Sequence, residues 1–212
     1  MVLHYTAMAS AAEARARLCA PEHEVSAHWL IDRDGSTEQL VDEGLRAWHA
    51  GAGEWGGAGD VNSRSIGIEL QNSGVEPFAE PQMAALEHLL AGILRRWDIP
   101  PQGVIAHSDM APDRKTDPGP RFDWRRLALA GLSVWPELQG GAMRDGGAGG
   151  SFAADARAFG YPQAENLLGA FRLRFRPWAS GPQDATDAAL AAALARRYGA
   201  GRYGIDRAPA GA

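Results

Sequence analysis

The chain has 212 residues, 45% of them hydrophobic, and a formal net charge of -5 at pH 7. This size and composition suit one medium globular domain, or one medium and one small domain. The net negative charge and the mixed charge pattern argue against a nucleic-acid-binding protein and against a polybasic membrane anchor. The single cysteine, Cys19, excludes an intrachain disulfide and a multi-cysteine metal site. No window approaches the roughly 20 apolar residues that a transmembrane helix needs.

The first third of the chain alternates short strands with helical segments. Residues 2–6 predict a short buried strand, and the Ala- and Arg-rich residues 10–20 predict a helix. Residues 26–32 and 36–41 flank an Arg-Asp-Gly turn and predict a hairpin. Residues 49–64, rich in Gly, Trp and Asn, predict a long surface loop.

The middle third continues the same alternation. In residues 66–70 the isoleucines and the leucine face one way and Glu69 faces the other. Residues 81–97 predict the clearest helix, since a proline suits its first turn and its apolar residues form one stripe. Residues 103–107 predict a short strand that ends in His107. Together these elements predict an α/β fold with a mixed central β-sheet flanked by helices.

A change in composition divides the chain into segments. We expect an α/β domain at residues 1–139, a Gly-rich linker at 140–150 and a frayed tail at 201–212. Between the linker and the tail, residues 151–200 carry three short amphipathic stretches. They predict a small three-helix module, which would be only marginally stable alone.

One short segment concentrates the reactive side chains. His107, Lys115 and Asp117 lie within eleven residues, on a segment whose prolines prevent one continuous helix. An imidazole, an amine and a carboxylate on a rigid loop suit a catalytic metal site better than a core-packing element. Asp117 precedes Pro118 and Gly119, so it is also typical of a turn residue, and spacing alone does not separate the two interpretations.

Two of the six histidines stand out as candidate metal ligands. His4 and His107 both lie at or near the ends of predicted strands, where catalytic groups of α/β folds gather. With Asp117 they would supply three protein ligands to zinc and leave a fourth position open.

The other histidines have ordinary explanations. We expect His28 to make structural hydrogen bonds, and His23 and His88 to be solvated. His49 opens the Gly-rich loop, which could border a cleft, so a substrate-binding role and a structural role are equally open.

Two further charged residues could complete the chemistry. Glu69 lies on an otherwise apolar strand, where a carboxylate is costly to bury without a partner, so it is either paired or functional. Beside a metal site it would be a natural general base. Lys115 could stabilise a developing oxyanion, although its residue type alone favours an exposed loop lysine. Residues 51–56 match G-x-G-x-x-G but neither follow a strand nor open a helix, which argues against a dinucleotide site.

Several motifs resemble one enzyme family. VLHYT, VSAHWLIDRDG, RAWHAG, NSRSIGIELQN and AHSDMAPDRKTDPGPRFDW resemble, in this order, the zinc-dependent N-acetylmuramoyl-L-alanine amidases of the AmpD/AmiD type. That family shares its fold with the peptidoglycan recognition proteins. The resemblance spans about residues 2–127, and its last motif is the most specific. Residues 151–200 are similar, more weakly, to the peptidoglycan-binding module of AmiD-like enzymes.

The resemblance implies a role for each candidate residue. It implies that His4, His107 and Asp117 bind one Zn²⁺ per chain, that Glu69 is the acid/base residue and that Lys115 is the oxyanion-stabilising cation. The implied reaction is hydrolysis of the amide between N-acetylmuramic acid, or its 1,6-anhydro form, and L-alanine. The implied substrate is peptidoglycan or a muropeptide, in cell-wall turnover or recycling.

Other features of the function remain open at this point. Arg114 and His49 are candidate substrate residues, the former as a bidentate partner for a stem-peptide carboxylate. The alternatives are a non-catalytic peptidoglycan-binding protein and a zinc endopeptidase that acts on the stem peptide. We expect a monomer with no nucleic-acid partner and no transmembrane span.

The start of the chain departs from the family pattern. Relatives have residues before the first strand, whereas His4 is the fourth residue here. We therefore expect a short edge strand that supports His4 thinly. If a signal segment precedes Met1, we expect the protein in the periplasm or cell envelope, and otherwise in the cytoplasm.

Overall fold

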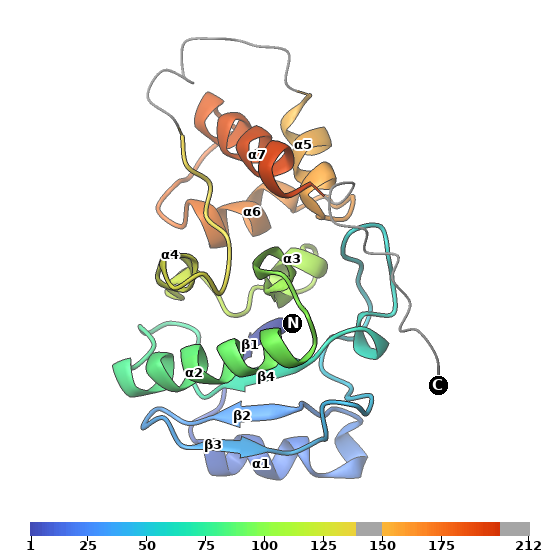
Figure 1. Ribbon diagram of the computed structural model, residues 1–212, viewed down its shortest axis with the longest axis vertical. Coiled ribbons are helices and arrows are strands. Elements are labelled where there is room, and N and C mark those ends of the chain that lie inside the picture. The colour runs from blue at the N-terminus through green and yellow to red at the C-terminus, as the bar shows by residue number, and fades with distance from the viewer. Residues whose placement is uncertain (139–149, 200–212) are drawn as a thin grey trace.

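The computed structural model describes residues 1–138 and 150–199, and a five-stranded sheet forms the base of the molecule (Figure 1). The sheet order is β3-β2-β4-β1-β5, in which β2 and β3 are antiparallel and the other pairs are parallel. The predicted α/β fold with a mixed central sheet is therefore confirmed. The strands are β1 Val2–Tyr5, β2 Trp29–Ile31, β3 Thr37–Gln39, β4 Gly67–Leu70 and β5 Ile105–Ala106.

The first strand is not an edge strand, so that expectation was wrong. β1 lies between β4 and β5, and Leu3 pairs with Ile68 on one side and with Ala106 on the other. Val2 and Leu3 are fully buried, as apolar residues of an interior parallel strand are when both faces of the sheet are covered. The N-terminal ammonium also donates to the Gly103 carbonyl at 3.0 Å. The strand that carries His4 is therefore supported on both sides.

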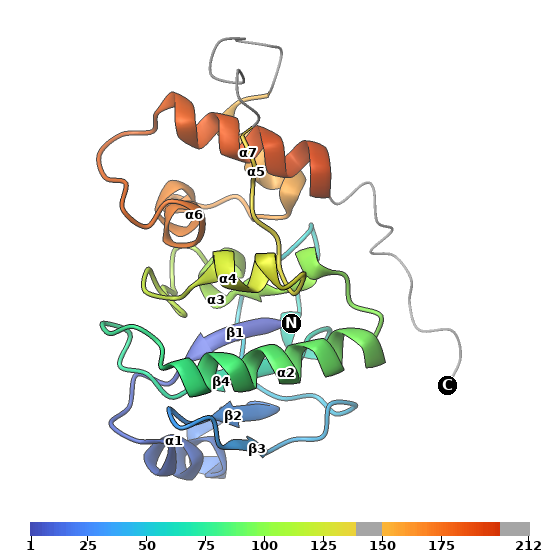
Figure 2. The same ribbon diagram turned by 60° about the vertical axis from the view of Figure 1, so that its left-hand side comes forward.

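Helices cover the sheet where the sequence predicts them. α2 lies across one face of the sheet in both ribbon views, and its apolar stripe packs on alternate residues of the strands (Figures 1 and 2). On the other face, Val2 and Ile105 pack with Ala50 and Val61 of the long loop and with Met110 of α3. The bounds are α1 Ala11–Leu18, α2 Glu80–Arg96, α3 His107–Met110 and α4 Trp124–Leu129, with 3-10 turns η1 Pro21–His23, η2 Val61–Ser63 and η3 Pro101–Gly103.

The strand that was predicted over residues 103–107 is shorter than expected. It comprises Ile105–Ala106, because His107 already begins α3. Asp109 causes this early helix start, since its carboxylate accepts the Ala106 N–H at 2.8 Å and so satisfies a donor at the helix N-terminus. His107 thus lies at the junction of a strand and a helix.

The three C-terminal helices also form where they were predicted. They are α5 Phe152–Phe159, α6 Leu167–Phe175 and α7 Ala185–Tyr198, and they lie beyond α3 and α4 in both ribbon views. Their apolar cluster includes Val134 and is flanked by Trp55, both from the sheet-containing part. Nearly all of the expected linker at 140–150, and the tail at 201–212, lie outside the described residues, and the division into domains stays a prediction.

A buried polar network joins the C-terminal helices to α3. Arg174 of α6 donates to Asp109 at 2.5 Å, and both side chains are fully buried. Tyr161 donates its hydroxyl to the other oxygen of the same carboxylate at 2.5 Å. Arg174 also donates to the Val104 carbonyl at 3.1 Å and lies 4.2 Å from the ring centre of Trp124. The C-terminal helices therefore contact the segment that carries His107.

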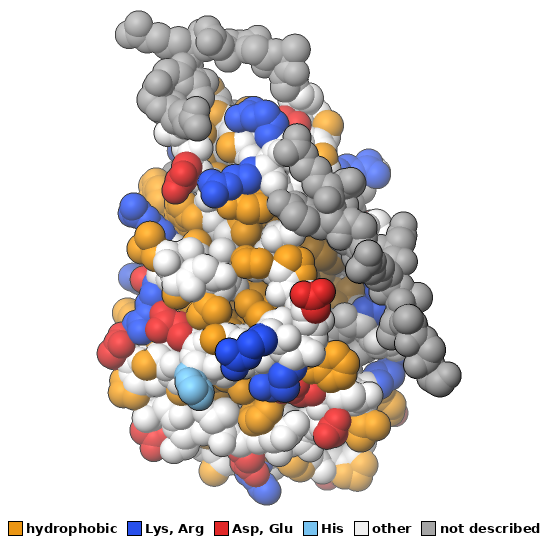
Figure 3. Space-filling model, viewed as in Figure 1, with side chains coloured by type: hydrophobic (Ala, Val, Ile, Leu, Met, Phe, Trp, Pro, Cys, Tyr) orange, Lys and Arg blue, Asp and Glu red, His pale blue; other side chains and the backbone are white. Residues whose placement is uncertain are grey.

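The molecular surface agrees with the charge pattern of the sequence. On the face shown in Figure 3, basic and acidic side chains are interspersed. Within residues 1–138 and 150–199, no helix combines the length and the apolar character that crossing a membrane would require.

Candidate metal centre and active site

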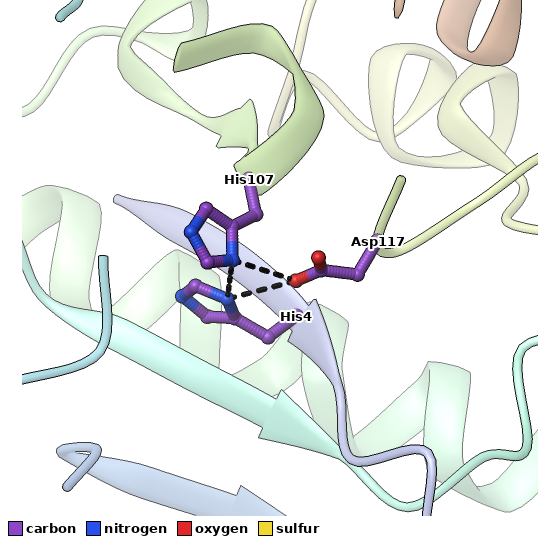
Figure 4. Close-up of side chains that lie close together, drawn as sticks. All are labelled: His4, His107 and Asp117. Atoms are coloured by element: carbon purple, nitrogen blue, oxygen red, sulfur yellow. Dashed lines mark hydrogen bonds and ion pairs between the residues drawn. The ribbon is translucent and has the colours of Figure 1, made fainter. Parts of the chain in front are cut away.

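The three predicted metal ligands lie together although they are far apart in the sequence. His4 projects from β1, His107 from the start of α3 and Asp117 from the following loop (Figure 4). Nδ1 of His4 lies 2.9 Å from Nδ1 of His107 and 2.9 Å from Oδ2 of Asp117. Nδ1 of His107 lies 3.0 Å from the same carboxylate oxygen. All three residues are buried, and they form a group that could hold a metal ion.

Sheet topology explains why these residues meet. β1, β4 and β5 are parallel, so the residues at their carboxyl ends gather at one edge of the sheet. His4 lies near the end of β1, and His107 directly follows β5. A backbone hydrogen bond from Ser108 N–H to the Asp117 carbonyl, 3.1 Å long, brings the loop back to α3.

The ionisation states of the group suit a metal site. Burial, and after it the neighbouring His107, lower the pKa of His4 to about 4, so the His4 ring is neutral at pH 7. Burial works to raise the pKa of Asp117, yet that pKa lies below its usual value because His107 and His4 contact the carboxylate. Imidazole nitrogens and an ionised carboxylate oxygen are donors that zinc takes in proteins. The residues present therefore fit a zinc ion.

Glu69 lies beside this group on the adjacent strand. It pairs in register with His4 and lines the same cavity of about 360 Å³ as the three candidate ligands. Its Oε2 atom is buried and has no hydrogen-bond partner among the residues that the structure describes. Burial raises the pKa of Glu69 well above its usual value, and the nearby Asp117 carboxylate adds to the rise. A buried carboxyl group with a raised pKa and a free oxygen is a candidate for proton transfer.

Two of the remaining candidates have different positions at the cavity. Lys115 is half-buried and lines the cavity, and its role as an oxyanion-stabilising cation stays a prediction. Arg114 is exposed at the rim, where one terminal nitrogen donates to the carbonyls of Ala50 at 2.7 Å and Ala52 at 2.5 Å. Its substrate role stays a prediction, since part of its guanidinium already holds a loop.

The histidines outside the triad have distinct environments. His49 is buried with Nδ1 3.0 Å from Nε2 of His4, and it also borders the cavity, so its substrate role stays a prediction. His28 accepts the Gly67 N–H at 3.0 Å and its other ring nitrogen lies 3.0 Å from the Leu45 carbonyl. The structural role predicted for His28 is thus confirmed, and His23 and His88 are exposed, as expected.

The structure adds cavity residues that sequence reasoning did not single out. Trp48, half-exposed at 51%, lines the cavity together with Arg17 and Leu18 of α1. Tyr5 also lines it, and its hydroxyl lies 3.0 Å from that of Thr116. In the sequence, only its position next to His49 indicates that Trp48 could line the cavity. Nothing local marks α1 as a cavity wall.

Comparison with known proteins agrees with this geometry. Residues 1–120 match the family model described as N-acetylmuramoyl-L-alanine amidase. This chain belongs to that family. AmiD of Escherichia coli is 35% identical, across 84% of this chain and 76% of AmiD. The 1,6-anhydro-N-acetylmuramyl-L-alanine amidase AmpD of the same organism is 42% identical, across 50% of this chain and 57% of AmpD.

Solved structures extend the similarity of this amidase into its C-terminal helices. E. coli AmiD, in complex with anhydro-N-acetylmuramic acid-L-Ala-D-γ-Glu-L-Lys, matches with a TM-score of 0.85 and 33% identity, covering 93% of this chain and 88% of AmiD. AmpDh3 of Pseudomonas aeruginosa, in complex with anhydromuramic pentapeptide, matches with a TM-score of 0.83 and 33% identity, covering 93% of this chain and 91% of AmpDh3. The resemblance to AmpD/AmiD-type amidases is thereby confirmed, together with the fold and the amidase activity that it implied.

Proposed function

We propose that this amidase uses one Zn²⁺, held by His4, His107 and Asp117, to cut the amide between an N-acetylmuramoyl group and L-alanine. The observation that carries the proposal is the convergence of three ligand atoms, 2.9 to 3.0 Å apart, beside a buried carboxyl oxygen without a partner among the described residues. We also propose a monomer as the active unit, and the supply of all three ligands by one chain is consistent with it.

The protein residues divide the chemistry between them. Zinc, when bound, supplies a Lewis acid that makes a water molecule nucleophilic at neutral pH. Glu69 takes the proton of the attacking water on its free carboxyl oxygen and then passes that proton to the leaving amine of L-alanine. The Lys115 ammonium stabilises the negative charge that develops on the amide carbonyl oxygen.

We propose muropeptides with a 1,6-anhydro-muramoyl end as substrates. The support is the similarity to AmiD and AmpDh3, whose structures hold anhydro-muramoyl peptides. A stem peptide carries carboxylates, and the guanidinium nitrogens of Arg114 that do not hold the loop are available to one of them. Trp48 offers an exposed aromatic face in the same cavity.

Metal removal tests the proposal most directly. Treatment with a chelator should abolish cleavage of an anhydro-muropeptide, and added Zn²⁺ should restore it. Mass spectrometry should detect the free stem peptide with an N-terminal L-alanine. Cleavage within the stem peptide would instead support an endopeptidase, and binding without cleavage would support a non-catalytic binding protein. Full activity of metal-free protein would contradict the zinc proposal.

The role of Glu69 has a separate test. Glu69→Gln should keep zinc but lower kcat by about 10²-fold or more, because a proton-transfer group is removed without loss of a ligand. Glu22→Gln, at an exposed position, serves as the matched control and should keep full activity. Loss of zinc from Glu69→Gln would show that Glu69 supports the metal rather than the proton transfer.

A further inference from the structure

Both candidate histidine ligands turn the same ring atom toward the metal site and the opposite atom toward one dipeptide. Their Nδ1 atoms face Asp117. Nε2 of His107 lies 2.8 Å from the carbonyl oxygen of Ala50. Nε2 of His4 lies 3.0 Å from Nδ1 of His49. The dipeptide His49–Ala50 therefore contacts the far side of both ligands.

The contact with Ala50 determines which nitrogen of His107 carries the proton. A carbonyl oxygen only accepts hydrogen bonds, so Nε2 of His107 must be the donor. In the neutral ring, Nδ1 then has a free lone pair directed at Asp117. Arg114 donates to the same carbonyl at 2.7 Å, which its two lone pairs allow. The backbone of the loop thus prepares His107 as a metal ligand.

A chain of hydrogen bonds likewise determines which ring nitrogen of His4 carries the proton. The Ser65 hydroxyl donates to the Val61 carbonyl at 2.6 Å, so its oxygen is free to accept from Nε2 of His49 at 3.2 Å. When Nε2 of His49 donates to Ser65, the lone pair of the neutral ring lies on Nδ1, which then accepts. His4 must then donate from Nε2, which leaves the lone pair of its Nδ1 facing the metal site.

One side chain holds the dipeptide in place. Oδ1 of Asn62 accepts the N–H of His49 at 3.1 Å and the N–H of Ala50 at 2.7 Å. The His49 ring also packs closely on β4, where a Cβ on Gly67 would lie only 2.3 Å from Cγ of His49. The dipeptide is therefore held from its backbone side by Asn62 and from its side-chain side by the sheet.

We propose that Asn62 is a positioning residue that orients both histidine ligands through the dipeptide His49–Ala50. It keeps His4 and His107 in the form that carries the proton on Nε2 and presents Nδ1 to the metal. Hydrogen-bond partners behind a metal ligand typically change metal affinity by about 10- to 100-fold. The inference rests on the proposed zinc site and deepens it, because it names a residue that would support two ligands without touching the metal.

Zinc affinity tests the proposal without an activity assay. Asn62→Ala should bind Zn²⁺ at least about 10-fold more weakly than the unmodified protein in competition with a chromogenic chelator. Asn62→Asp keeps an oxygen acceptor for both N–H groups and should restore most of the affinity. Asn72→Ala is the control: Asn72 is buried, whereas Asn62 is half-buried, and the Asn72 side chain also accepts a loop N–H, that of Gly74, but bonds to neither ligand nor the dipeptide. Equal affinity of Asn62→Ala and Asn72→Ala would overturn the proposal.

Side-chain ¹⁵N NMR of the unmodified protein provides a second test, which holds even if Asn62→Ala does not fold. In the metal-free protein at neutral pH, His4 and His107 should both carry their proton on Nε2. A proton on Nδ1 of either ring would overturn the proposal. If the rings have the expected form but the protein binds no Zn²⁺, the zinc proposal fails while the positioning by the dipeptide stands.

Discussion

The two candidate histidine ligands are supported by different kinds of structure. His4 belongs to β1, which is hydrogen-bonded on both sides within the sheet. His107 begins α3, a helix of four residues that follows a strand of two. A helix of one turn has little stability of its own, because the conformational entropy lost in nucleation exceeds the free energy gained from the hydrogen bonds of one turn. The position of His107 therefore depends on contacts that α3 makes with the rest of the molecule.

Some of those contacts come from the C-terminal segment. Asp109 caps the start of α3 and accepts hydrogen bonds from Arg174 and Tyr161. The strand that carries His4 is thus held within the sheet, whereas the helix that begins at His107 also contacts a segment about 65 residues further along the chain. The C-terminal segment thus supports the helix that begins at the candidate ligand His107.

Among the contacts that support α3, loss of Arg174 should lower the free energy of unfolding most. Arg174→Met leaves the Asp109 carboxylate buried without its cation, which should lower the free energy of unfolding by about 3–5 kcal/mol. Denaturant unfolding monitored by circular dichroism measures this loss. Arg197→Met removes an exposed arginine 3.6 Å from Glu137 and should change stability by less than about 0.5 kcal/mol. Equal effects of the two variants would show that the buried pair does not join the two parts.

A core substitution in β1 tests how firmly the sheet holds the strand that carries His4. Leu3 is fully buried in the cluster under α2, so Leu3→Ala should cost about 2–5 kcal/mol through lost apolar burial and a cavity. Leu129→Ala is the matched control, since Leu129 is 82% exposed. Calorimetry compares the two. A small effect of Leu3→Ala would mean that β1 is not the rigid support that its position between two strands implies.

A milder substitution at Tyr161 separates the hydrogen bond to Asp109 from the packing of the ring near α3. Tyr161→Phe removes the hydroxyl that donates to Asp109 but keeps the ring, and should cost about 1.5–3 kcal/mol because the lost bond is to a buried charge. Tyr5→Phe, whose hydroxyl bond to Thr116 is exposed, should cost much less. Urea unfolding of both variants provides the measurement. A neutral Tyr161→Phe would assign the support of α3 to Arg174 alone.

The smallest expected effect is the pH-dependent contribution of Glu69, on β4, to the free energy of unfolding. The pKa of Glu69 in the folded protein is raised above its usual 4.5, so its contribution to stability is complete below pH 4.5 and is lost as pH rises toward the raised value. Metal-free Glu69→Gln should therefore gain stability relative to the unmodified protein as pH rises from about 4.5 to 8.

Glu80 serves as a control with a pKa shift in the opposite direction. Arg126 lowers the pKa of the exposed Glu80, so Glu80 contributes stability above its usual pKa of 4.5 and loses it as pH falls. Glu80→Gln should accordingly lose stability relative to the unmodified protein as pH rises. Unfolding by urea at several pH values measures both variants. A difference for Glu69→Gln that does not vary with pH would refute the raised pKa.

Much of the fold follows from local patterns in the sequence. The apolar stripe of residues 81–97 and the Arg-Asp-Gly turn between residues 26–32 and 36–41 predict α2 and the β2–β3 hairpin, because helix and turn preferences act over a few residues. His107, Lys115 and Asp117 could likewise be selected together, since one short segment holds all three.

Other features depend on packing between distant segments. Residue types and local motifs are enough to predict the donor atoms of the candidate site, most of the short helices and strands, and the amidase family. Packing between distant segments places β1 inside the sheet, brings Asn62 to the dipeptide behind His4 and His107, and pairs Arg174 with Asp109. The physical reason is that strand order and buried polar pairs are set by which surfaces exclude water together, and no local preference encodes that choice.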